Sequence, residues 1–144
     1  IFTTKSLLLE IKSSFEIDSS NKIEIEGDDN LHIKTNRFAL REILNILVEN
    51  AIKYSPKSSM VLIKYDKKEI QVIDQGIGIS DNEKAKVFNR FYQVEKSRTN
   101  HTGNGIGLAI AQQYAQIINA EIYISDNLPN GTIFHLSFKN VNEK

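Results

Sequence analysis

Five of the seven glycines in this chain lie in two short segments, residues 74–79 (DQGIGI) and residues 103–108 (GNGIGL). Glycine allows the main chain to approach a ligand closely and exposes its N–H groups as hydrogen-bond donors. Two such loops in a chain of 144 residues therefore indicate a nucleotide site in which the main chain binds as much as the side chains do.

The length and charge of the chain restrict the class of protein. A chain of 144 residues can bury a sizeable core, and we expect residues 1–144 to form a single domain. Eighteen basic residues balance 18 acidic ones, which argues against a nucleic-acid partner because such proteins usually carry a basic excess. The absence of cysteine excludes a disulfide framework. Because the first residue is Ile1 rather than Met, we expect a fragment of a longer protein.

Hydrophobic periodicity predicts a mixture of helices and strands. The longest predicted helix, residues 36–55, has an apolar stripe, Asn36 as its N-cap and Pro56 just after its end. Helices and paired strands in this mixture favour an α+β two-layer sandwich. The other expected helices cover residues 3–14, 81–91 and 106–118, and the expected strands cover residues 22–26, 31–33, 60–65, 69–74, 121–125 and 132–138.

The second glycine segment imitates a dinucleotide-binding fingerprint, because it opens a predicted helix and the next strand is followed by Asp126. The context rejects that interpretation. Residues 95–101 are polar and cannot form the buried strand that must precede the loop, and too little chain follows Asp126 for further βα units. The segment is then either a glycine hinge or a loop whose N–H groups and helix start receive phosphate.

Three polar side chains share one flank of the long helix, beside its apolar stripe: Asn50, Lys53 and Tyr54. Asn50 must satisfy its amide, either by bonding the main chain or by offering its carbonyl oxygen to a hydrated Mg²⁺ ion. Lys53 either reaches a phosphate or stays solvated. Tyr54 packs either on a base or sugar, or on the core.

Asp74 stands where a predicted apolar strand meets the first glycine segment. A carboxylate fixed at that place can accept a hydrogen bond from the exocyclic amine of adenine, whereas guanine presents a carbonyl oxygen there. The alternative is a turn residue that bonds its own main chain.

Taken together, these segments resemble the ATP-binding catalytic domain of bacterial sensor histidine kinases, in the superfamily that includes gyrase, Hsp90 and MutL. Five motifs occur in the family's order, from about Ser6 to the end of the chain. They are an Asn box (residues 49–55), a first glycine box (74–79), a Phe box (87–92), a second glycine box (103–108) and a closing Gly131-Thr132 pair. The resemblance implies a mixed sheet of about five strands packed on three helices, with a mobile ATP lid at residues 93–104.

The resemblance also implies the ligands and the site residues. Asn50 would coordinate Mg²⁺, Asp74 would bind the adenine amino group, and Arg90 would approach the phosphates as a charge stabiliser. The remaining implied ATP-binding residues are Lys53, Tyr54, Gly76, Gly78, Ile79, Lys96, Arg98, Gly103, Gly105, Ile106, Gly107, Leu108 and Thr132.

The implied activity is that of a protein histidine kinase in two-component signal transduction, which donates the γ-phosphate of ATP to a histidine. None of the three histidines, His32, His101 and His135, precedes an acidic residue as the family's phosphoacceptor does. We therefore expect the acceptor, the dimer interface and the response-regulator dock on a separate helical domain. We expect this fragment alone to be a monomer that does not phosphorylate itself. We expect the longer protein to be a homodimer anchored in the inner membrane, with this domain on the cytoplasmic side.

One position departs from the family pattern. Ile46 lies four residues before Asn50, where the family often has a second Asn and the related ATPases have a water-activating Glu. Efficient ATP hydrolysis is therefore not expected, and Mg²⁺ binding is in question. Ile46 leaves open a non-enzymatic nucleotide-sensing module. A serine kinase of the anti-sigma-factor type is a further alternative, against which the intact Phe box argues.

Overall fold

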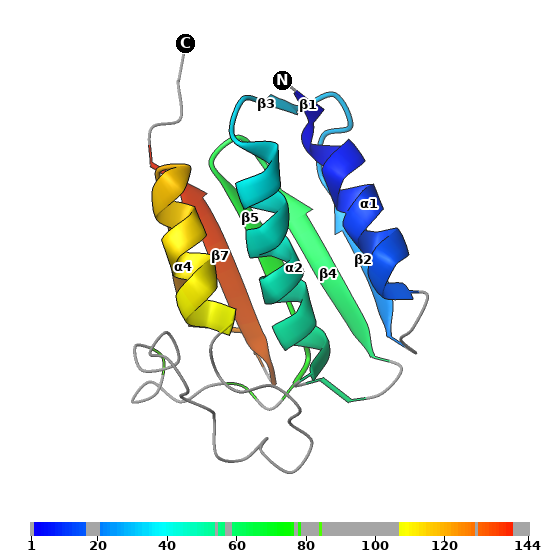
Figure 1. The fold of residues 1–144 in the computed structure, drawn as a ribbon. Helices are drawn as coiled ribbons and strands as arrows, with labels where there is room; N and C mark the ends of the chain where they lie inside the picture. The colour runs from blue at the N-terminus through cyan, green and yellow to red at the C-terminus, as the bar shows by residue number, and fades with distance from the viewer. Residues whose placement is uncertain are drawn as a thin grey trace.

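The computed structural model describes residues 2–16, 21–53, 55–56, 59–76, 78, 84, 107–128 and 130–139. These residues form two layers, a five-stranded mixed sheet and three helices that cover one of its faces (Figure 1). The predicted α+β two-layer sandwich is confirmed. The helices are α1 (Thr4–Glu16), α2 (Arg37–Lys53) and α4 (Gly107–Ile117), and the sheet strands are β2 (Lys22–Glu26), β4 (Met60–Tyr65), β5 (Glu69–Ile73), β6 (Ala120–Asp126) and β7 (Thr132–Phe138).

The order of the strands brings distant parts of the sequence together. The sheet runs β2-β4-β5-β7-β6, with β2 parallel to β4 and every other pair antiparallel. Because β7 is antiparallel to both β5 and β6, the C-terminal ends of β5 and β6 lie beside the start of β7, at one end of the sheet. In the register, Ile73 faces Ile133 and Asp126 faces Thr132.

The hydrophobic core lies between the sheet and the helices. Ile70 and Val72 on β5 are fully buried and point into this core, while Glu69 and Gln71 alternate onto the other face of the sheet. The same alternation directs the side chain of Asp74 toward the helix-covered side. The largest buried side chains come from α1, α2 and the sheet, among them Leu7, Leu8, Ile11, Leu40, Ile43, Leu44, Leu47, Ile63, Phe134 and Leu136.

Several local predictions are confirmed in detail. The main-chain N–H of Ala39 donates to Oδ1 of Asn36 at 3.0 Å, so Asn36 is the N-cap of α2. The helix ends at Lys53, before Pro56. The sequence did not predict β1 (Phe2–Thr3), which pairs with β3 (His32–Ile33), because two residues are too few to show a period. The predicted helix at residues 81–91 lies outside the described residues except for Lys84.

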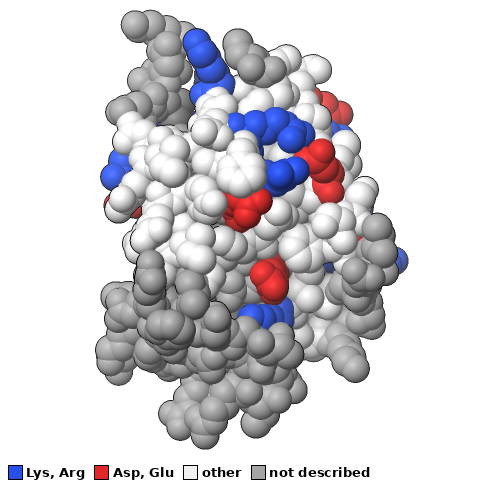
Figure 2. Space-filling view, in the orientation of Figure 1, with Lys and Arg blue, Asp and Glu red and all other residues white. Residues whose placement is uncertain are grey.

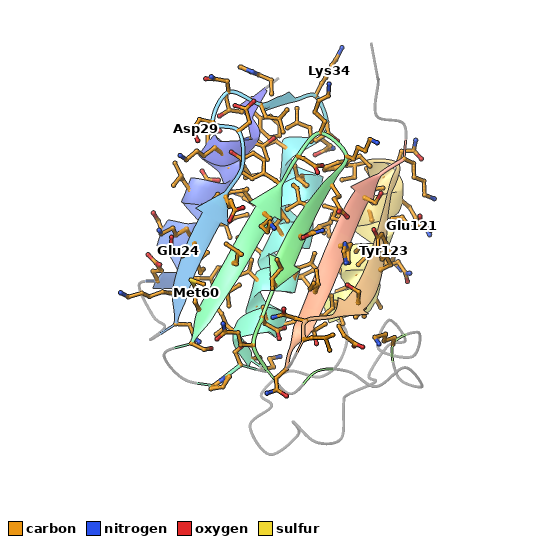
Figure 3. All side chains as sticks on the ribbon, turned by 180° about the vertical axis from the view of Figure 1, so that it is seen from behind. Glu24, Asp29, Lys34, Met60, Glu121 and Tyr123 are labelled. Atoms are coloured by element: carbon orange, nitrogen blue, oxygen red, sulfur yellow. The ribbon has the colours of Figure 1, made fainter. Side chains whose placement is uncertain are left out.

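The uncovered face of the sheet carries a polar cluster (Figure 3). The imidazole of His135 lies 3.0 Å from Oε1 of Glu69 through Nδ1 and 2.7 Å from Oγ of Ser125 through Nε2, and the ring of Tyr123 stacks on it. His135 is thus a packed strand residue, and His32 is an exposed one. Among the described residues, no helix combines the length and the apolar character that crossing a membrane requires.

Candidate functional site

The predicted site residues that the structure describes gather at one end of the sheet. The C-terminal end of α2, the N-terminal end of α4, the end of β5 and the turn between β6 and β7 lie together at the lower end in Figure 1. These elements carry Asn50, Gly107, Asp74 and Thr132, respectively. The fold therefore brings together residues that are up to 82 positions apart in the sequence, from Asn50 to Thr132.

Asp74 is buried, and its two carboxylate oxygens have different roles. Oδ1 accepts the N–H of Gly76 at 2.9 Å and the N–H of Thr132 at 3.0 Å. No described residue donates a hydrogen bond to Oδ2. The bond from Gly76 makes Asp74 a turn residue, as the alternative interpretation expected, yet Oδ2 remains available to a ligand.

Burial perturbs the acidity of this carboxylate. Only 1% of Asp74 is exposed. Loss of hydration raises the pKa of Asp74 from its ordinary value of 3.8 to about 6, against the opposing effect of the two N–H donors. The carboxylate is therefore still ionised at neutral pH, but its buried surroundings destabilise the charged form. A further hydrogen-bond donor would stabilise that form.

The turn between β6 and β7 encloses the main chain of Asp74. The N–H of Asp74 donates to the carbonyl oxygen of Thr132 at 2.9 Å, and the side-chain amide of Asn127 donates to the carbonyl oxygen of Asp74 at 2.7 Å. Gly131 has a φ of +122° and sits so close to that carbonyl that a Cβ would overlap it. The turn thus needs glycine at this position.

Asn127 was missed as a site residue by the sequence analysis. The sequence predicts only a turn at residues 127–131, because an Asn between two strands is typical of any loop. A signal was nonetheless present: the closing Gly131-Thr132 pair follows it within the same turn.

Asn50 is half-buried on the last turns of α2, and its amide bonds the main chain, which is one of its two predicted roles. Its Nδ2 donates to the carbonyl oxygen of Ile46 at 2.8 Å, which fixes the orientation of the amide. Its Oδ1 accepts no hydrogen bond from a described residue. An oriented and unpaired amide oxygen is a ligand of the kind that Mg²⁺ prefers.

The start of α4 packs against α2 beside Asn50. A Cβ on Gly107 would lie 3.5 Å from Cγ2 of Ile46, an ordinary contact distance. Ile46 therefore fills, with an apolar methyl group, the space where the resemblance placed a polar side chain. Leu108 belongs to the core, so any contact it makes with a ligand must go through its main chain.

The remaining predicted residues divide into two groups. Lys53 is half-buried at the end of α2 and has no ion pair with a described residue, while Gly76 is buried and Gly78 has a φ of +81°. Outside the described residues lie Tyr54, Ile79, Arg90, Lys96, Arg98, Gly103, Gly105 and Ile106. Figure 2 shows that basic and acidic side chains are intermixed on the helix-covered side, with no large basic patch on the described part of this face.

Solved structures with this arrangement of elements are catalytic domains of histidine kinases. The catalytic domain of the histidine kinase ThkA has a TM-score of 0.79 at 23% identity, with 95% of this chain and 92% of that chain covered. A mycobacterial sensor histidine kinase, MprB, has a TM-score of 0.73 at 24% identity, with 94% and 92% covered. The fold is therefore the histidine kinase catalytic fold.

The chain belongs to the family of histidine kinase-, DNA gyrase B- and HSP90-like ATPases, whose model matches residues 35–142. It is 35% identical over 127 residues to the sensor protein CiaH of Streptococcus pneumoniae, covering 83% of this chain and 29% of CiaH. It is 37% identical over 114 residues to the histidine-protein kinase ArlS of Staphylococcus aureus, covering 76% and 25%. The chain thus spans less than a third of the length of these curated relatives.

Proposed function

We propose that residues 1–144 form the single ATP-binding catalytic domain of a sensor histidine kinase, which donates the γ-phosphate of ATP to a histidine on another domain. The observation that carries this proposal is the buried carboxylate of Asp74, at the same end of the sheet as Asn50 and the start of α4. Two N–H groups hold its Oδ1, and no described residue donates a hydrogen bond to its Oδ2.

Adenine recognition follows from the chemistry of Asp74. The exocyclic amine of adenine can donate to Oδ2, whereas the carbonyl oxygen of guanine would meet a second acceptor. A hydrogen bond to a charged group contributes about 1.5–3 kcal/mol. Burial strengthens this discrimination because an unpaired acceptor in a dry place is costly.

A magnesium ion fits the end of α2. Asn50 would hold the ion through its free Oδ1, while the bond from Nδ2 to Ile46 keeps that oxygen turned outward. The described residues hold no group of three or more His, Cys, Asp or Glu side chains that could bind a metal. The ion would therefore take its other ligands from phosphates and water, as Mg²⁺ often does. When bound, it would neutralise phosphate charge during transfer.

The transfer itself needs positioning rather than a protein nucleophile in this chain. A ring nitrogen of the acceptor histidine attacks the γ-phosphorus, the bond from that phosphorus to the bridging oxygen breaks, and ADP leaves with the electron pair. Lys53, with Arg90, Lys96 and Arg98, would balance the phosphate charge. The acceptor would lie on an adjacent helical dimerisation domain on the cytoplasmic side, and a response regulator would take the phosphate from it.

Two measurements test this proposal. Titration calorimetry of this chain with ATP, with and without Mg²⁺, should show tighter binding in the presence of the metal. Radiolabelling with γ-labelled ATP should then label a longer protein that includes the adjacent helical domain, but not this chain alone. A longer protein with intact Asn50 that binds ATP and stays unlabelled would contradict the kinase assignment.

A second candidate function is a non-enzymatic nucleotide-sensing module. The contact between Ile46 and the start of α4 supports it, because an apolar methyl group occupies a place next to the proposed metal ligand. Metal-independent binding of ATP or ADP, together with an unlabelled full-length protein, would favour the sensor over the kinase.

A further inference from the structure

Asn127 is the only described side chain that bonds the main-chain carbonyl of Asp74. Its Nδ2 lies 2.7 Å from that oxygen, and because a carbonyl oxygen can only accept, the orientation of the amide is settled. The side chain is half-buried in the turn after β6. The N–H of Asn127 also donates to the carbonyl oxygen of Gly131 at 3.1 Å, which closes the turn.

The bond acts on the peptide that follows Asp74. The carbonyl oxygen that Asn127 holds belongs to the peptide between Asp74 and Gln75, and this peptide directs the chain toward the N–H of Gly76. That N–H is one of the two donors that hold Oδ1. If the peptide rotates, the Gly76 donor is lost and the two carboxylate oxygens are no longer distinguished.

The place of Asn127 is itself fixed from two sides. The preceding residue, Asp126, pairs with Thr132 in the strand ladder, and its carboxylate lies 3.0 Å from Nζ of Lys84. Asn127 therefore extends from the anchored end of a strand, so that little main-chain entropy remains to be lost when its side chain bonds Asp74.

We infer that Asn127 is a positioning residue for the Asp74 carboxylate: its amide holds the peptide after Asp74 so that Oδ2 points at the exocyclic amine of a 6-aminopurine. This inference rests on the proposed function. It adds that the turn between β6 and β7 sets the affinity for adenine, although Asn127 itself does not touch the base.

The test compares ATP binding across four variants of this chain, and across Asp74→Asn alone as a reference, by titration calorimetry. Asn127→Ala removes the donor and should weaken ATP binding by about fivefold to tenfold. Asn127→Asp keeps the shape but sets an acceptor against the Asp74 carbonyl, and should weaken binding further. Asn130→Ala is the matched control, because Asn130 lies exposed in the same turn and has no hydrogen bond to a described residue. It should bind ATP as the wild type does.

The fourth variant combines Asn127→Ala with Asp74→Asn and separates positioning from a general loss of structure. If Asn127 acts through the carboxylate, removing it should change affinity less than twofold once Asp74 is already Asn. ITP, which carries a carbonyl oxygen in place of the 6-amino group, should bind equally to the wild type and to Asn127→Ala. Circular dichroism and thermal melting of each variant establish that it is folded.

Three outcomes would overturn the inference. Asn127→Ala could bind ATP as tightly as Asn130→Ala, or it could lose the same factor in the wild-type and Asp74→Asn backgrounds. In either case the proposed function would survive, because the wild type still binds ATP. A folded wild-type chain that binds no ATP would instead overturn the proposed function, and this inference with it.

Discussion

Replacing Asp74 by Asn should weaken ATP binding and stabilise the fold at the same time. The substitution keeps the size of the side chain and an oxygen that can accept from Gly76 and Thr132, which now hold Oδ1 at 2.9 and 3.0 Å. It changes the second position from an acceptor to an NH₂ donor, which faces the exocyclic amine of adenine with the wrong polarity.

The gain in stability follows from the perturbed pKa. In the folded chain the pKa of Asp74 is raised to about 6 from its ordinary value of 3.8, because burial disfavours the charged form. Folding is thus disfavoured by up to about 3 kcal/mol wherever the group is ionised in both states. The penalty is absent below pH 4, grows between about pH 4 and pH 6, and is constant above pH 6. Asp74→Asn should remove it only at the higher pH.

The loss of affinity follows from the hydrogen bond. A bond to a charged acceptor contributes about 1.5–3 kcal/mol, so ATP should bind about tenfold to a hundredfold more weakly to the variant. In the wild type, ATP affinity should also fall as the pH drops below about 6, because the protonated carboxyl no longer offers two acceptors.

The assays are urea unfolding at pH 4 and pH 8, and ATP titration calorimetry at pH 8. Asp66→Asn is the matched control: Asp66 also accepts two main-chain N–H groups at a turn, at 2.7 and 3.0 Å, but it is exposed. It should leave ATP affinity unchanged. The reasoning is refuted if Asp74→Asn binds ATP normally, or if its stability relative to wild type is the same at both pH values.

Four other substitutions separate the parts of the site. Gly131→Ala should destabilise the fold by about 2 kcal/mol or more, because Ala disfavours a φ of +122° and its methyl group would overlap the Asp74 carbonyl. Gly107→Ala should change the free energy of unfolding by no more than about 1 kcal/mol in the same urea assay, because its Cβ would lie at an ordinary contact distance of 3.5 Å from Ile46. Asn50→Ala should lower ATP affinity about tenfold in Mg²⁺ but not in EDTA, by calorimetry. Ile46→Asn should cost about 1–3 kcal/mol in urea unfolding yet strengthen Mg²⁺-dependent ATP binding, and an unchanged metal dependence would contradict this.

Much of the fold could be predicted because its signals are local. The alternating pattern KIEIE gave β2 its bounds, and an Asn before an apolar stripe gave α2 its N-cap. The pairing of β2 with β4 in parallel could not be predicted, because no turn links them and parallel register leaves no mark in either strand.

Residues whose side chains would contact a ligand could be proposed from the sequence. Residues that only hold such a side chain in place through hydrogen bonds could not. Asp74 was predicted as an adenine ligand from its place at the end of an apolar strand; the structure buries it, with 1% exposed, and its role in binding stays a prediction. Its bonds to Thr132 and Asn127 span more than 50 residues of sequence, and each uses main-chain atoms that every residue possesses. The N–H that Thr132 donates could come from any residue except proline, so no residue pattern predicts that bond.

The described part of the site is organised unequally between its two ends. Four hydrogen bonds join Asp74 to the strand and turn of the closing motif and to the N–H of Gly76: two through Oδ1, one through its N–H and one through its carbonyl oxygen. Asn50, by contrast, is fixed by one bond within its own helix. A carboxylate whose pKa is raised by burial would lower its energy by protonation or by rotating toward water, and these four bonds oppose the rotation. Under the proposed function, the free energy that folding loses by burying the charge would contribute to selectivity for a donor at Oδ2. Loosening the turn should reduce adenine selectivity before it reduces the affinity for phosphate.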